Sequence, residues 1–110
     1  MDISTEQVAQ TMVVRLSGNL DTNTSTPAQE ALDGLIDDGN NSLLVNLRDT
    51  GFVSSAGLRI LLATAKRLNK TEGSLKITNL NDTVREVFEI SGFISILSVY
   101  DTEEAALQDG

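Results

Sequence analysis

The chain has 110 residues, 40% of them hydrophobic and 22% charged, with a formal net charge of −8 and neither Cys nor His. One domain with a single core fits that length, and the acidic balance speaks against nucleic acid as a ligand, because phosphate contacts need clustered Lys and Arg. Without His or Cys the chain cannot assemble a Ser-His-Asp triad, a thiol nucleophile or the usual zinc sites, so we do not expect an enzyme.

The first part of the chain predicts two strands and a helix. Residues 1–10 are a weakly patterned first strand, and residues 11–17 alternate in hydrophobicity as a half-buried strand does. A turn at residues 18–21 (GNLD) follows. Thr26 is the expected N-cap of the next helix, and Gly39 lies just past its end, where a left-handed residue needs no Cβ.

The stretch 43–68 is the one around which we expect the domain to be built. It opens with a short apolar run without helical periodicity, which suits a strand buried on both faces. Phe52 and Val53 are then expected to return the chain to the core. Ser54 and Ser55 stand where a helix should begin, because hydrophobic residues follow them at helical spacing.

Three further elements close the chain. An alternating strand is expected over residues 74–78, followed by a helix capped by Asn81 or Asp82. A final apolar strand over residues 93–100 and a short helix capped by Thr102 complete the order β, β, α, β, α, β, α, β, α. This order predicts a compact α/β domain with a mostly buried sheet.

The two adjacent serines mark a strand-to-helix junction, where partners and ligands usually meet an open α/β sheet. A negative group on either Ser54 or Ser55 would face free backbone N–H groups and the positive end of the helix dipole. The simplest role of such a serine is to cap the helix, which is worth about 1 kcal/mol. The local sequence matches neither a G-x-S-x-G nucleophile elbow nor a phosphate-binding loop.

Two motifs carry a resemblance to a known family. Residues 52–58 (FVSSAGL), preceded by VNLRD at 45–49, resemble the core motif of STAS domains, and more specifically that of bacterial anti-sigma factor antagonists. The turn at 18–21 resembles the G-x-L-D turn of that family. The resemblance implies one STAS domain over residues 1–110, an α/β fold whose central mixed sheet has about four to five strands packed with about four helices.

In that family the serine of a D-S-[ST]-G-L motif is phosphorylated by the partner anti-sigma factor, which is also a kinase. Aligned through Gly57 and Leu58, that serine falls on Ser55. Ser54 then replaces the Asp of the motif, and Ala56 replaces its second Ser or Thr. Because of these departures, Ser54 is a second candidate for phosphorylation.

The resemblance also implies a set of partner-binding residues around the junction. The set consists of Asp21, Ser54, Ser55, Ala56, Gly57, Leu58 and Arg59. Asp21 could equally be a turn residue that binds its own backbone, and Leu58 could equally belong to the core.

The implied function is that of a cytoplasmic anti-sigma factor antagonist. Its unphosphorylated form binds an anti-sigma factor serine kinase and frees a sigma factor, phosphorylation turns binding off, and a serine phosphatase resets the cycle. No cofactor or metal is expected, because ATP belongs to the kinase, and neither direct nucleic-acid binding nor membrane insertion is expected. The chain is expected to be a monomer or a weak dimer.

Two alternative functions stay open. The domain could be a STAS docking or regulatory subunit of a transporter or another complex, without a phosphorylation switch. It could also be a small-molecule or nucleotide-binding module that uses the same junction, although the chain has no phosphate-binding loop.

Overall fold

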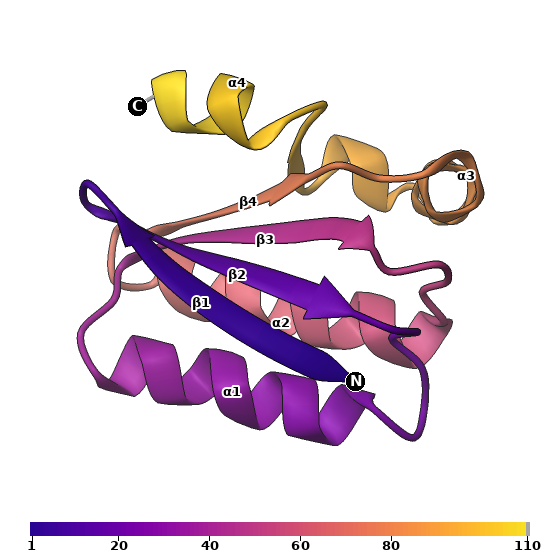
Figure 1. Ribbon diagram of the computed structural model, residues 1–110, viewed down its shortest axis with the longest axis horizontal. Helices are drawn as coiled ribbons and strands as arrows, with labels where there is room; N and C mark the ends of the chain where they lie inside the picture. Colours follow the sequence, from indigo (N-terminus) through magenta and orange to yellow (C-terminus); the bar gives the residue numbers. More distant parts are fainter. Residues whose placement is uncertain (110) are drawn as a thin grey trace.

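The computed structural model describes residues 1–109 and contains a five-stranded sheet (Figure 1). The strands are β1 (Asp2–Val8), β2 (Thr11–Ser17), β3 (Ser42–Asp49), β4 (Ser74–Thr78) and β5 (Ser98–Tyr100). The helices are α1 (Ser25–Asp37), α2 (Ser55–Asn69), α3 (Asp82–Ser91) and α4 (Glu103–Gln108), with a 3₁₀ turn, η1, at Phe93–Ser95. The strands lie side by side in chain order, β1 antiparallel to β2 and the others parallel. This mixed α/β architecture confirms the predicted fold class.

The two faces of the sheet are covered unequally. Helices α1 and α2 pack against one face, and the short α4 lies over the other (Figure 1). Strand β3 shows the division, because its side chains alternate between the faces. Leu44 packs with Val13 and Ala106 of α4, and the residues of β3 that join the large core under α1 and α2 are Leu43, Val45 and Leu47. The predicted burial of this strand on both faces is therefore confirmed.

Most of the predicted helix ends are confirmed by their hydrogen bonds. The side chain of Asn81 accepts from the backbone N–H of Val84 at 2.7 Å and caps α3. Thr102 accepts from the backbone N–H of Ala105 at 3.1 Å and caps α4. Gly39, just past α1, has the left-handed φ of +98° that its position requires.

Helix α1 begins earlier than predicted, at Ser25 with Thr24 as its N-cap residue, so the prediction of Thr26 as the cap was wrong. The carbonyl of Asp21 accepts from the backbone N–H groups of Thr24 and Ser25, at 3.2 and 2.8 Å. Since this turn already winds the chain in the helical sense, the helix continues directly from it.

The predicted strand over residues 93–100 was also wrong over most of its length, because only Ser98–Tyr100 forms β5. Gly92, with φ of +81°, ends α3 and redirects the chain into η1. The carbonyl of Phe93 then accepts from the N–H groups of Ile96 and Leu97, at 3.1 and 2.9 Å. Phe93 and Leu97 therefore meet the core from a turn and not from a strand, while Ile96 stays 64% exposed.

Candidate functional site

Strands β2, β3 and β4 run parallel and end at the same edge of the sheet, where the predicted site residues gather. The loop from β3 to α2 and the first residue of α2, together residues 50–55, are called the junction below. Leu20, which follows β2, donates its N–H to the carbonyl of Phe52 and accepts from the N–H of Ser54, both at 2.9 Å. Leu20 and Val53 also form a parallel bridge and are both fully buried. The turn at 18–21 is thereby fixed beside the junction.

The other side of the junction is held by the start of α3. The amide of Asn81 donates to the carbonyls of Thr50 and Gly51, at 3.2 and 3.3 Å. The buried hydroxyl of Thr50 donates to the carbonyl of Leu16 at 3.0 Å. The junction is therefore bound to β2 itself and to the segments that follow β2 and β4.

The two serines of the junction have different surroundings. Ser54 is half-buried and is the N-cap of α2, its hydroxyl accepting from the backbone N–H of Gly57 at 3.3 Å. Ser55, the first residue of α2, is exposed, and within the described residues 1–109 its hydroxyl has no hydrogen-bond partner. The fold therefore uses the hydroxyl of Ser54 and leaves that of Ser55 open to solvent.

This difference predicts unequal effects on stability. Ser54→Ala removes the cap and should lower the free energy of unfolding by about 1 kcal/mol. Ser55→Ala removes an exposed hydroxyl and should change it by less than about 0.5 kcal/mol. Urea unfolding of the two variants and the wild type checks this, and a larger loss for Ser55→Ala would contradict the assignment of the cap.

Two of the predicted contact residues lie beneath the surface. Leu58 is only 4% exposed and belongs to the core, as the alternative interpretation of this residue expected. Gly57 is buried against Leu20, where a Cβ would lie 2.7 Å from the backbone oxygen. Ala56 is half-buried and Arg59 is exposed. A partner at this edge could therefore contact Arg59 directly, while Gly57 and Leu58 support the surface from below.

Asp21 closes its own turn, which is one of its two predicted roles. Its carboxylate accepts from the backbone N–H groups of Asn23 and Thr24, at 2.9 and 3.3 Å. It directly follows Leu20, so the turn that it stabilises is the one bound to the junction. Its partner-contact role remains a prediction.

Phe52 does not return the chain to the core, so that expectation was wrong. Its side chain is 43% exposed, whereas the next residue, Val53, is fully buried. The bridge between Val53 and Leu20 explains the difference, because consecutive residues of an extended segment point to opposite sides.

The electrostatics at Ser55 suit a negative group. The first turn of α2 contains no acidic residue, and the last turn carries Lys66 and Arg67. The 15-residue helix therefore presents the positive end of its dipole at Ser55 without local repulsion. Arg59 lies four residues further on the same helix face and forms no salt bridge within residues 1–109.

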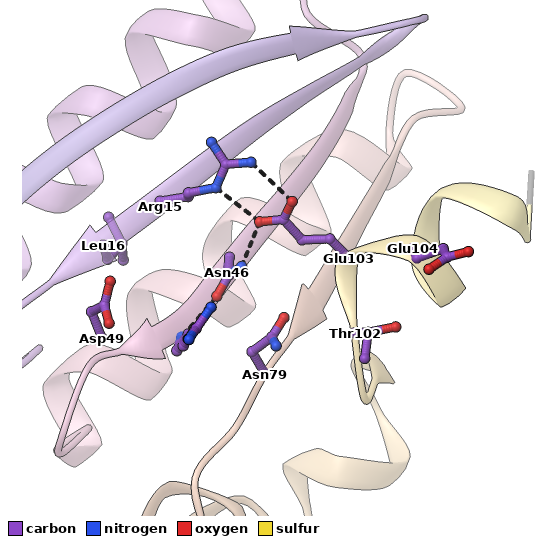
Figure 2. Close-up of a pocket in the computed structure, with 9 residues that line it drawn as sticks. Arg15, Leu16, Asn46, Asp49, Asn79, Thr102, Glu103 and Glu104 are labelled. Atoms are coloured by element: carbon purple, nitrogen blue, oxygen red, sulfur yellow. Dashed lines mark hydrogen bonds and ion pairs between the residues drawn. The ribbon is translucent and has the colours of Figure 1, made fainter.

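A polar cluster that the sequence did not reveal holds α4 to the sheet (Figure 2). Arg15 of β2 donates from Nε and Nη2 to the two carboxylate oxygens of Glu103, both at 2.9 Å, and from Nη1 to Glu6 at 2.8 Å. The amide of Asn46 donates to Glu103 as well. We call these four residues the clasp. The hydrogen bond from Arg15 holds the pKa of the Glu103 carboxyl below its usual range.

The clasp predicts a pH-dependent contribution to stability. The pKa of Glu103 is lower in the folded protein than in the unfolded chain, so the ionised carboxylate stabilises the fold. This stabilisation is fully present above the unfolded pKa of about 4.3 and is lost as the pH falls through the lower pKa of the folded protein. Glu103→Gln should lower the free energy of unfolding at pH 7 by about 1 kcal/mol, since the half-exposed Arg15 is partly screened by water. Urea unfolding at pH 7 and at about pH 3 should show the deficit shrinking in acid.

The matched control for the clasp is Glu104→Gln. Glu104 is exposed and forms no ion pair with Arg15, and a Gln in its place keeps the oxygen that accepts from Gln108, so its replacement should leave both the stability and its pH dependence close to wild type. A deficit as large as that of Glu103→Gln would show that the clasp is not the cause.

An open pocket of about 410 Å³ lies beside the clasp (Figure 2). Its lining is mostly polar and consists of Arg15, Leu16, Asn46, Arg48, Asp49, Asn79, Thr102, Glu103 and Glu104. No residue of the junction lines it, so it gives no support to a small-molecule site at the junction. Within residues 1–109 no group of acidic side chains could hold a metal ion, and no helix is long and apolar enough to cross a membrane.

Comparison with known proteins agrees with this architecture. A family model described as "STAS domain" matches residues 2–106. The chain belongs to the STAS domain family. The resemblance seen in the motifs at 18–21 and 52–58 is thereby confirmed for the domain as a whole.

Individual STAS relatives cover nearly the whole chain. A provisionally named anti-sigma factor antagonist of Bordetella bronchiseptica, BtrV, is 34% identical, over 96% of this chain and 91% of its own. An anti-sigma F factor antagonist of Paenibacillus polymyxa is 29% identical, over 99% of this chain and 94% of its own. The anti-sigma factor antagonist SpoIIAA, solved in its unphosphorylated form, superposes with a TM-score of 0.83 at 27% identity, covering 98% of this chain and 95% of its own.

These relatives place this STAS domain among the anti-sigma factor antagonists. Such proteins are regulatory and not enzymatic, in agreement with the prediction drawn from the absence of His and Cys.

Proposed function

We propose that this chain is a cytoplasmic anti-sigma factor antagonist controlled by phosphorylation of Ser55. The unphosphorylated form binds an anti-sigma factor serine kinase and so frees a sigma factor for transcription. Phosphorylation of Ser55 releases the kinase, and a serine phosphatase restores the binding form. The observation that carries the proposal is the hydroxyl of Ser55 at the start of α2, which is exposed and has no hydrogen-bond partner within residues 1–109, on a junction fixed by hydrogen bonds to Leu20.

The relatives support the proposal in two respects. Proteins that match nearly the whole chain are named as antagonists of anti-sigma factors. SpoIIAA has also been solved in a phosphorylated form, which superposes on this chain with a TM-score of 0.74 at 26% identity. A STAS domain of this shape can therefore carry a phosphate and stay folded.

The physical basis of the switch is a charge placed in an interface. A phosphate adds about −1.5 to −2 charges and three acceptor oxygens. At Ser55 the dipole of α2 and the nearby guanidinium of Arg59 can tolerate that charge in the free protein. A partner packed over the same residue would have to bury the charge, which is costly without a matching cation. The switch therefore acts on binding and leaves the fold intact.

Intact-mass spectrometry after incubation with ATP and the serine kinase encoded nearest to the gene of this chain tests the proposal. We expect one phosphate on the wild type and on Ser54→Ala, and none on Ser55→Ala. If only Ser54→Ala lacks the phosphate, the phosphorylation site is Ser54 and not Ser55. If none of the three proteins is phosphorylated while the kinase modifies another substrate, the chain is a docking subunit without a phosphorylation switch.

A further inference from the structure

One aromatic side chain of the junction has no role in the core. Phe52 is 43% exposed, whereas Phe88 is fully buried and the other two aromatic residues, Phe93 and Tyr100, are partly buried. Phe52 is also not a member of either hydrophobic cluster formed by the buried residues of the described chain, 1–109. The exposed part of the ring adds nothing to the hydrophobic stabilisation of the monomer and is free to be covered by a partner.

The backbone that presents this ring is fixed on both sides. The carbonyl of Phe52 accepts from the N–H of Leu20 at 2.9 Å, and the next residue, Val53, is fully buried in the bridge to Leu20. The preceding carbonyl, of Gly51, accepts from the amide of Asn81 at 3.3 Å. An exposed ring on a braced backbone loses little conformational entropy when a partner covers it.

The ring also lies next to the proposed switch. Phe52 is three residues before Ser55. Its loop is bound on one side to the turn at 18–21 and on the other side to the start of α3. The neighbouring loops supply exposed or half-buried polar groups, among them Asp21 and Asp82. An apolar centre surrounded by polar groups is the usual anatomy of a protein interface, and aromatic residues are enriched among its strongest contacts.

We propose that Phe52 is the apolar anchor of the surface that docks the kinase. The inference rests on the proposed function, and it adds the chemistry that the partner must offer: a pocket for an aromatic ring, bordered by basic side chains. The basic border follows from the net charge of −8 and from the carboxylates of the two loops bound to the junction, Asp21 and Asp82. The ring of Phe52 provides binding affinity, and phosphorylation of Ser55 regulates binding. Mutation of Phe52 should therefore weaken binding even when Ser55 is unphosphorylated.

The test is the Kd for the same kinase, measured by isothermal titration calorimetry with unphosphorylated protein. Phe52→Ala should raise the Kd about 10- to 100-fold, and Phe52→Tyr, which keeps the ring, should stay within about threefold of wild type. The matched control is Ile90→Ala, which removes an apolar side chain that is 80% exposed near the far end of α3 and should leave the Kd within about twofold. Circular dichroism melting curves should be unchanged, because Phe52 lies outside the core.

Each outcome decides between the two proposals. If wild type binds but Phe52→Ala binds equally well, Phe52 is not the anchor, and the proposed function stands. If Ile90→Ala weakens binding as much as Phe52→Ala does, the docking surface is not centred on the junction, and the inference is overturned. If wild type does not bind the kinase at all, the proposed function and the anchor both fail.

Discussion

A phosphate on Ser55 should weaken binding of the kinase by at least about 100-fold while the melting temperature stays within about 3 °C of the unmodified protein. The loss of affinity is expected because the interface would have to bury a dianion at a position where the free protein keeps it in water. The melting temperature is expected to stay nearly unchanged because the hydroxyl of Ser55 has no hydrogen-bond partner within residues 1–109, so its phosphorylation breaks no bond of the fold. The start of α2 also favours negative charge.

The measurement needs the phosphoprotein purified from the kinase reaction, with its Kd obtained by calorimetry and its melting curve by circular dichroism. Ser55→Ala is the control, since it should bind as the wild type does and keep that affinity after incubation with kinase and ATP. A melting temperature that drops by 10 °C or so on phosphorylation would contradict the proposal, because the modification would then act through unfolding.

Gly57→Ala should destabilise the domain strongly, although glycine to alanine within a helix normally stabilises by about 1 kcal/mol. A Cβ on Gly57 would lie 2.7 Å from the backbone oxygen of Leu20 and 2.8 Å from its Cγ. Relief requires the start of α2 to move away from the segment that Leu20 anchors, and such overpacking costs about 1 to 3 kcal/mol or more. Urea unfolding should show the loss directly.

Gly34→Ala is the matched control for that prediction. Gly34 is exposed within α1, and among residues 1–109 no atom outside its own stretch of helix lies within 4 Å of the position that its Cβ would occupy. The ordinary helical preference should therefore prevail and raise the free energy of unfolding by about 0.5 to 1 kcal/mol. Gly→Ala is thus expected to lower the free energy of unfolding at residue 57 and to raise it at residue 34. A rise at both residues would show that α2 can move away from Leu20 without loss of stability.

The parts of this fold that follow from local chemistry could be predicted from the sequence. Helical spacing after Ser54 locates α2, and the capping preferences of Asn81 and Thr102 locate two further helix starts. The apolar run that opens the stretch 43–68 is enough to identify the central strand, because a strand covered on both faces has no polar side to alternate with.

The errors arise where a local pattern has two structural outcomes. An apolar segment after Gly92 suits a strand or a turn that packs on the core, and the left-handed conformation of that glycine favours the turn. The start of α1 was misplaced for a similar reason, because both Thr24 and Thr26 are acceptable caps. The turn around Asp21, which depends on tertiary position, selects Thr24.

Of the candidate site, the sequence predicts the residues but not their exposure. Nothing in the string FVSSAGL distinguishes the exposed ring of Phe52 from the buried side chain of Val53, since that depends on the bridge to Leu20. The clasp was beyond prediction as well. Arg15 and Glu103 are 88 positions apart and meet only because α4 folds back over the sheet.

The antiparallel pairing of β1 with β2 carries a consequence for handling the protein. It brings the start of β1 to the edge of the sheet that carries the junction, where the Cα of Met1 lies 3.5 Å from the position that a Cβ on Gly18 would occupy. Helix α4 lies on the opposite side of the sheet from α1 and ends away from the start of β1 (Figure 1). There the backbone carbonyl of Asp109 accepts from the side chain of Lys76 of β4 at 2.6 Å. An affinity tag, a fluorophore or a sensor surface attached after α4 should leave the junction accessible, and one attached before β1 should crowd it.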